Sequence, residues 1–279
     1  MFGAGILPDY FSILSYELQF CSMVKYVCLF LMLYISSASL AQTDTIPSTA
    51  YDVSALPVLK DSSRYRIQIM DGHTPYLSNL EVHITMLEPG RSAHPAHKHA
   101  NTEELIIVKE GKLKVTIAGK TKILGPGGVA MAMPGDLHEA VNDSKEKVSY
   151  YLLKYTKKGT GSVAVNTKAI PSILVDWDEV AVQKNDRGFR RQHFNQSTVL
   201  FEKFDMHATT LTQGQISHAP HTHRQEEIII VRKGNIEMQI GSAFQKAQPG
   251  DIIFLNGYVP HALKNLSKGE CEYFAFQWQ

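Results

Sequence analysis

The chain has 279 residues and a net charge of +1, from 28 Lys and Arg against 27 Asp and Glu. Hydrophobic residues make up 44% and charged residues 20%, which excludes bulk disorder. The balanced charge gives no sign of a nucleic-acid surface, and three cysteines are too few for a disulfide scaffold. Twelve histidines are the unusual feature, and their spacing is the main clue to function.

The N-terminal forty residues have the pattern of an export signal. A basic residue precedes the apolar run YVCLFLMLYI at 26–35, and small residues follow up to Ala41. This pattern predicts a signal peptide over residues 23–41 that is cleaved after Ala41. Because a spanning helix needs about 20 apolar residues, we expect a periplasmic or extracellular protein without a stable membrane span. Residues 1–22 are interpreted as an over-extended start, with Met23 as the true start.

The rest of the chain consists of two copies of one repeated unit. Ten of the twelve histidines pair at an offset of 123 or 124 residues, which scattered core histidines would not do. The pairs are His83 with His207, His94 with His218, His97 with His221, His99 with His223, and His138 with His261. We therefore expect an N-terminal arm over 42–59, a first domain over 60–156, a linker over 157–170 and a second domain over 171–279.

Each copy is predicted to be all-β. EELIIVKEG at 103–111 and EEIIIVRKG at 226–234 are short apolar runs that end in a charged turn with Gly. The segments 112–124 and 235–247 have the pattern of hairpins that turn near a central Gly. Only residues 175–182 are compatible with a short helix. Many short strands at close, even spacing favour a sandwich or barrel.

Three histidines and one glutamate of each copy are predicted to form a metal site. They are His97, His99, Glu104 and His138 in the first copy, and His221, His223, Glu227 and His261 in the second. On a strand, the two histidines of each His-x-His pair would share one face. Three imidazoles and a carboxylate suit a divalent transition metal, Mn, Fe, Ni, Cu, Co or Zn, with up to two ions per chain. Four protein ligands leave two positions of a six-coordinate ion for substrate. The alternative, a metal-free polar network, would make a costly barrel interior.

These motifs resemble those of the bicupins, proteins with two cupin domains. The matching spacings are His97-x-His99-x4-Glu104-x6-Gly111 with His138-x3-Asn142, and His221-x-His223-x3-Glu227-x6-Gly234 with His261-x3-Asn265. The resemblance implies two tandem cupin double-stranded β-helix (jelly-roll) barrels, each with its metal inside. Two positions depart from the pattern: Gly90 lies one residue further from His97 than usual, and Asn256 stands where Pro is usual.

Bicupins with metal in both halves include oxalate decarboxylases and quercetinase-like dioxygenases. The resemblance therefore implies a metalloenzyme that acts on a small oxygen-rich molecule as a dioxygenase, decarboxylase or isomerase. The alternative is a non-catalytic, metal-containing cupin that binds a small molecule or a sugar. We expect a small-molecule partner and no nucleic acid, and a homo-oligomer is left open.

The sequence offers few candidates for catalysis beyond the metal. Glu104 and Glu227 are candidates, as is Tyr258, an aromatic residue able to pack on a planar substrate. At the matching turn the first copy has an acid, Asp136. This difference favours the second barrel as the main site.

Other polar residues near the motifs have two interpretations each. Glu103 and Glu226 are expected to point away from the metal, as surface acids or as acids that support the ligands. The basic cluster at 186–191 is predicted to be a solvated turn, with docking of an anionic substrate as the alternative. His94 and His218 are expected either at the pocket mouth or in a plain loop. For His83 and His207, packing in the core or between the domains is favoured over an orientation toward the barrel interior.

Overall fold

The strands of this chain form two large and two small sheets. The computed structural model describes residue 1 and residues 45–61, 64–158 and 170–279. Residues Thr45–Gln279 form one compact unit. The predicted signal peptide and most of the predicted linker lie outside the described residues. Among the residues described, no helix is long and apolar enough to cross a bilayer.

The first copy builds a seven-stranded antiparallel sheet and a four-stranded sheet. In sheet order, the large sheet is β12 (Ile173–Val175), β9 (Val129–Ala132), β6 (Thr102–Glu110), β11 (Val148–Lys157), β4 (Leu77–Leu87), β3 (Arg64–Gly72) and β2 (Leu59–Lys60). The small sheet is β5 (Arg91–Ser92), β10 (His138–Asn142), β7 (Leu113–Ile117) and β8 (Lys120–Leu124). Apolar side chains of both sheets meet in one cluster, the core of the first barrel.

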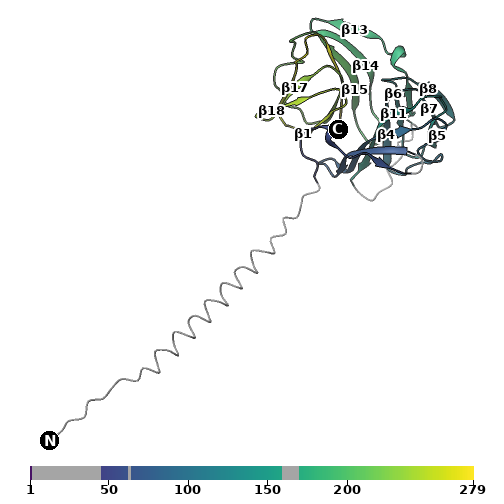
Figure 1. Cartoon of the computed structure of the whole chain (residues 1–279), viewed down its shortest axis with the longest axis horizontal. Coiled ribbons are helices and arrows are strands. Elements are labelled where there is room, and N and C mark those ends of the chain that lie inside the picture. The colour runs from purple at the N-terminus through teal and green to yellow at the C-terminus, as the bar shows by residue number, and fades with distance from the viewer. Residues whose placement is uncertain (2–44, 62–63, 159–169) are drawn as a thin grey trace. The chain divides into compact units, whose positions relative to one another are not determined.

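The second copy repeats this plan with a seven-stranded and a three-stranded sheet. The large sheet is β1 (Thr49–Tyr51), β19 (Ile252–Leu255), β16 (Glu226–Lys233), β21 (Cys271–Trp278), β15 (Phe204–Leu211), β14 (Gly188–Gln196) and β13 (Val182–Asn185). The small sheet is β18 (Ala243–Ala247), β17 (Ile236–Ile240) and β20 (His261–Asn265). Figure 1 shows this copy in green and yellow beside the first in blue and teal. The prediction of two tandem all-β barrels is confirmed.

The predicted hairpins are present in both copies. β7 pairs with β8 and β17 with β18, each around a glycine with positive φ: Gly119 at 78° and Gly241 at 62°. Glycine adopts this left-handed backbone without the strain that a Cβ would cause. The tight turn therefore follows from the residue that the sequence places there.

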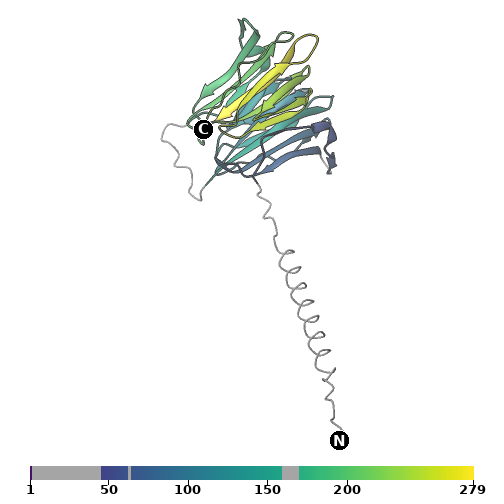
Figure 2. The same ribbon diagram turned by 90° about the vertical axis from the view of Figure 1, so that its left-hand side faces the viewer.

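A shared core joins the two barrels along their large sheets. Side chains alternate along β6, so that Leu105 and Ile107 enter the shared core while Ile106 and Val108 enter the first barrel. Aromatic rings of both copies meet there, with the Tyr155 and Trp278 ring centroids 5.0 Å apart. Figure 2 shows the strands of the two copies stacked in layers. Both faces of each large sheet are therefore buried.

The strand that precedes each copy in the sequence pairs with the large sheet of the other copy. β1 precedes the first copy but pairs with β19 of the second, and β12 precedes the second copy but pairs with β9 of the first. A short 3-10 helix follows each exchanged strand, η1 (Val53–Ala55) and η2 (Trp177–Glu179). The short helix expected within 175–182 is thus a single 3-10 turn. The exchange was not predicted, although the residues before each copy, Ser48 to Asp52 and Ser172 to Asp176, keep the 124-residue offset at both ends.

Candidate metal centres

The first barrel brings its four predicted ligands together. The ligand atoms of His97, His99, Glu104 and His138 all lie within 4.8 Å of one another. Glu104 comes from β6 and His138 from the start of β10. The expectation that the His-x-His pair lies on a strand is wrong, because His97 and His99 lie in a loop. Two backbone hydrogen bonds of 3.0 and 2.8 Å between His97 and His138 hold this loop against β10.

Backbone carbonyls determine which imidazole nitrogen faces the first centre. Nδ1 of His97 lies 3.0 Å from the Pro95 carbonyl oxygen, and Nδ1 of His138 lies 3.0 Å from that of Asp136. A carbonyl only accepts, so each Nδ1 is protonated and donates, and Nε2 is turned toward the carboxylate. His138 Nε2 is buried, makes no hydrogen bond and lies 3.6 Å from Glu104 Oε1.

In the second barrel, His223, Glu227 and His261 form one group, and His221 is grouped with His218 and His261 instead. The Nδ1 atoms of His223 and His261 lie 3.0 and 2.8 Å from the carbonyl oxygens of Gln225 and Val259. His223 Nε2 and His261 Nε2 each lie 3.2 Å from Glu227 Oε2. Two imidazole lone pairs aimed at a carboxylate would repel it, so a cation, either a proton or a metal ion, must lie between them. The donor set therefore fits a divalent transition metal.

The Glu227 carboxylate and the His261 imidazole of the second site shift each other's pKa toward the charged forms. Burial raises the pKa of Glu227, but hydrogen bonds with His223 and His261 outweigh it and bring the pKa to about 2. Burial opposes the charge of His261, yet the facing carboxylate of Glu227 raises the pKa of this imidazole. The carboxylate is thus held ionised, the form in which it would bind a metal.

A fifth side chain joins the second centre. His218, His221 and His261 have ligand atoms within 4.8 Å of one another, and so do His223, Glu227 and His261. The two groups share His261, and the His218 and His221 ring centroids are 4.0 Å apart. The matching His94 of the first copy instead bonds the Arg64 guanidinium, with 2.6 Å between Nε2 and Nη1. Of the two loop histidines, only His218 therefore lies within ligand reach of a candidate centre.

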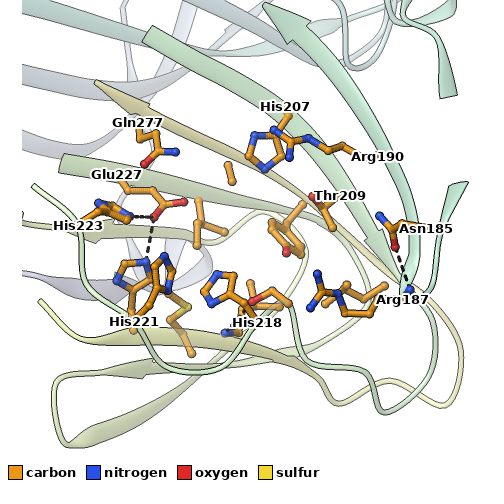
Figure 3. Close-up of a pocket in the computed structure, with 18 residues that line it drawn as sticks. Asn185, Arg187, Arg190, His207, Thr209, His218, His221, His223, Glu227 and Gln277 are labelled. Carbon is orange, nitrogen blue, oxygen red and sulfur yellow. Dashed lines mark hydrogen bonds and ion pairs between the residues drawn. The ribbon is translucent and has the colours of Figure 1, made fainter. Parts of the chain in front are cut away.

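A cavity of about 260 Å³ opens beside the second centre. Its walls include His221, His223, Glu227 and His261 on one side. The other side is polar, and Figure 3 shows its labelled side chains around the same space. It includes Asn185, Arg187, Arg190, His207 and Thr209, whereas Gln277 lies beside its register partner Glu227. Arg187 is exposed in a turn, as predicted for the 186–191 cluster, but it also lines the cavity, as does Arg190. His207 faces inward rather than serving only as packing.

Tyr258 does not line this cavity. Its side chain is 65% exposed, and it adopts a positive φ of 65° while its backbone N donates to the His223 carbonyl oxygen over 2.6 Å. The residue thus closes the turn beside the His-x-His segment, and its ring is turned to solvent. The corresponding acid of the first copy, Asp136, accepts a hydrogen bond of 2.6 Å from Ser172 Oγ.

Glu103 and Glu226 point away from the metal ligands, as predicted, but they are not surface acids. Both are fully buried, because the opposite face of each large sheet is covered by the other copy. Leu200 N donates to Glu103 Oε1 over 2.8 Å, and Trp278 Nε1 donates to Glu226 Oε2 over 3.2 Å. Their partners therefore lie between the copies rather than at the metal.

Comparisons with known proteins agree with this architecture. A family model described as "Cupin domain" matches residues 83–154 and 208–276, together half of the chain. No curated protein sequence matches. The crystal structure of the protein Ylba from E. coli is similar with a TM-score of 0.63 and 17% identity, covering 82% of this chain and 90% of that one.

Two further solved structures have the same fold. AerE from Microcystis aeruginosa has a TM-score of 0.61 and 15% identity, with coverage of 80% of this chain and 97% of that one. The oxalate decarboxylase from Lactobacillus farciminis, solved as a formate complex, has a TM-score of 0.62 and 11% identity, covering 84% and 87%. At these identities the similarity concerns the fold alone.

Proposed function

Because the chain belongs to the cupin family and contains two such domains, we propose that it is a metal-dependent enzyme with its main reaction centre in the second barrel. The observation that carries this proposal is the cavity of about 260 Å³ that reaches His221, His223, Glu227 and His261. A substrate in this cavity would meet the metal directly. The first barrel, whose four candidate ligands are grouped as one set, would hold a second ion.

The residues of the second centre have distinct roles in this proposal. His221, His223, His261 and Glu227 would hold the ion, and backbone carbonyls orient two of the imidazoles. A bound divalent ion would polarise an oxygen atom of the substrate and stabilise charge that develops there. The cavity would orient a small molecule in a partly water-excluded space. Dioxygenation, decarboxylation and isomerisation are the reaction classes to be tested.

The test combines metal analysis with matched ligand variants. Elemental analysis of protein from metal-replete medium is expected to approach two divalent ions per chain. His97→Ala is expected to empty only the first site and His221→Ala only the second, because the two sets share no residue. Turnover is then assayed on phenolics, oxalate and other dicarboxylates, and sugars, with Mn, Fe, Ni, Cu, Co or Zn restored. Loss of both ions from either variant contradicts the partition of ligands, and specific binding without turnover would support the non-catalytic alternative.

Metal removal also has a predicted dependence on pH. Metal binding requires neutral imidazoles, so metal affinity falls as the pH drops below the pKa of free histidine, about 6.5. An ion that binds only the folded state adds about 2.7 kcal/mol to the free energy of unfolding at a concentration 100 times its Kd. Chelation is therefore expected to lower the melting temperature more at pH 8 than at pH 5. Melting curves that chelation leaves unchanged at both pH values would argue against bound metal.

Export belongs to the same proposal. The apolar run at 26–35 and the small residues before Ala41 support cleavage and a periplasmic or extracellular location. The intact mass of the exported protein is expected to match a chain that begins at Gln42. A mature protein that retains residues 26–35 would contradict it.

A further inference from the structure

The cavity of the second barrel has a cationic wall opposite its candidate metal ligands. Arg187 and Arg190 line it together with the polar side chains of Asn185, His207 and Thr209. In Figure 3, Arg190 lies beside His207, and Arg187 lies beyond His218 as seen from His221. A ligand in this space would therefore meet the metal ligands on one side and two guanidinium groups on the other.

The positive charge of this wall is only partly neutralised by the protein. Arg190 Nη2 lies 3.8 Å from Asp205 Oδ2 and donates to Gln192 Oε1 over 2.8 Å. Asp205 also accepts a hydrogen bond of 2.7 Å from Gln192 Nε2. Within the part of the chain that the structure describes, the Arg187 guanidinium has no ion pair or hydrogen bond. Of the two arginines, only Arg190 thus lies near the carboxylate of Asp205, and Arg187 is available to a ligand.

The loop that carries Arg187 is nevertheless held in place. Asn185 Oδ1 accepts a hydrogen bond of 2.9 Å from Arg187 N, and Thr212 N donates to the Arg187 carbonyl oxygen over 2.9 Å. These bonds fix the backbone of the β13–β14 turn and leave the side chain free. The Arg187 guanidinium is therefore placed at the cavity by its backbone and is not needed to hold the turn in place.

In the corresponding wall of the first copy, both cations are paired with the carboxylate of Glu81. Arg66 occupies the position of Arg190, and its guanidinium bonds both Glu81 and Gln68. Glu81 also lies 3.8 Å from Lys154, which stands where the second copy has Gln277. At the position of Arg187 the first copy has Ser63, outside the described residues. The additional, unneutralised arginine is thus specific to the second copy.

We propose that the second-barrel cavity binds a small organic acid whose carboxylate is held by Arg187 and Arg190. A guanidinium binds a carboxylate through two parallel charge-assisted hydrogen bonds, which a neutral sugar or an uncharged phenolic would not provide. The volume of about 260 Å³ restricts the ligand to a small molecule. The part of the acid remote from Arg187 and Arg190 would face His221 and Glu227. As a substrate class this rests on the proposed function, but the carboxylate subsite itself requires no metal.

The test uses the full chain stripped of metal and then freed of chelator. Calorimetric titration with malonate, succinate and glutarate is compared with titration with neutral succinamide, and all are repeated after metal is restored. Binding of at least one dicarboxylate, and no binding of succinamide, is expected. Arg187→Gln and Arg190→Gln are each expected to weaken that binding about tenfold or more, since each removes a charge-assisted pair. Arg66→Gln, the matched change in the first copy, is expected to leave it unchanged.

Each outcome separates this inference from the proposed function. Binding of a dicarboxylate that depends on Arg187 and Arg190 in a protein that takes up no metal supports the subsite and contradicts the proposed function. Metal uptake and turnover with no dicarboxylate bound by either form overturns the subsite alone. Equal binding of succinamide, or full affinity in both arginine variants with unchanged melting temperatures, also overturns it.

Discussion

At the scale of single residues, the imidazoles of the two centres are oriented by main-chain carbonyls. His138 and His261 occupy matching positions and donate from Nδ1 to the carbonyl oxygens of Asp136 and Val259. The two loop histidines differ, since His94 bonds Arg64 while His218 lies with His221 and His261. The two copies thus have the same motif but different surroundings.

This difference predicts unequal effects of two matched substitutions. In a His97→Ala background, which isolates the second site, His218→Ala is expected to weaken metal binding about tenfold, because an imidazole within ligand reach is removed. His94→Ala in a His221→Ala background is expected to leave the first site unchanged. Competition with a chromophoric chelator measures both affinities. Unchanged affinity in the His218→Ala protein would remove this residue from the second centre.

Another residue-scale prediction concerns His193, which has no counterpart in the first copy. Its ring packs between Trp177 and Phe274, with centroid distances of 5.7 and 5.4 Å. Burial, together with the charges of Arg232 and Arg191, lowers the pKa of His193 to about 4. The unfolded chain therefore takes up this proton near pH 6.5, whereas the folded chain takes it up only near pH 4. Stability from neutral His193 is present above pH 6.5 and is lost as the pH falls toward 4.

Replacing His193 with an aromatic residue that does not titrate is expected to reduce this loss. His193→Phe keeps a ring beside Trp177, and its free energy of unfolding is expected to fall by about 2 kcal/mol less than that of the wild type between pH 7 and pH 4.5. Urea unfolding of metal-stripped protein at both pH values measures this difference. Identical pH dependence in the two proteins would show that protonation of His193 does not oppose folding.

At the scale of elements, the exchanged strands connect the two copies. Asn256 is one of the two residues that depart from the cupin pattern, and the position of β1 supplies a reason. Asn256 N donates to Ser48 Oγ over 2.8 Å, and Asn256 Nδ2 donates to the Ile46 carbonyl oxygen over 3.2 Å. A proline there would have neither donor. The Asn therefore anchors the segment that enters β1.

Loss of the Asn256 side chain is expected to loosen this segment. Asn256→Ala leaves the Ile46 carbonyl oxygen without that donor and is expected to lower the free energy of unfolding by about 1 kcal/mol. Limited proteolysis is expected to cut residues 45–58 faster in this variant than in the wild type. Asn79→Ala, which removes an exposed bond of 3.1 Å to Asp71 in the first copy, is the matched control. Equal cutting of both variants would show that Asn256 does not anchor the exchanged strand.

At the scale of the whole molecule, two buried acids lie in the core that the copies share. Glu226 accepts hydrogen bonds from Thr74 Oγ1, Tyr76 N and Trp278 Nε1, at 2.8, 3.3 and 3.2 Å. Glu103 accepts one from Leu200 N, and Leu200 matches Tyr76 at the 124-residue offset. Burial raises the pKa of Glu226. Each acid thus comes from one copy and bonds the turn of the other.

Removing the Glu226 carboxylate is expected to destabilise both copies together. Glu226→Ala leaves the buried Thr74 hydroxyl and Trp278 indole N–H without their acceptor, and a loss of about 3 kcal/mol in the free energy of unfolding is expected. Denaturant unfolding of metal-stripped protein avoids an indirect effect through Glu227. Glu237→Ala, in the small sheet of the same copy, is expected to change stability by less than about 0.5 kcal/mol. A change that small in Glu226→Ala, or unfolding of one copy alone, would contradict a role in joining the copies.

The duplication, the all-β class and the eight candidate ligands can all be predicted from the sequence. These features are local, since His97-x-His99 and its copy are recognised by spacing along the chain, and a glycine such as Gly119 permits the turn at its own position. The identity of the ligands also limits the metal, because imidazole and carboxylate chemistry does not depend on how the rest of the chain packs.

What covers each face of a sheet, and which strand joins which sheet, is visible only once the chain is folded. Side chains alternate along a strand, which places Glu103 and Glu104 on opposite faces of β6. This alternation does not reveal that the second copy covers the outer face of the sheet. In the same way, Arg187 in a charged turn is typical of a solvated loop until β13 and β14 place it at the cavity. Pairing between segments such as β1 and β19, about 200 residues apart in sequence, depends on the packing free energy of the whole molecule, which no local pattern contains.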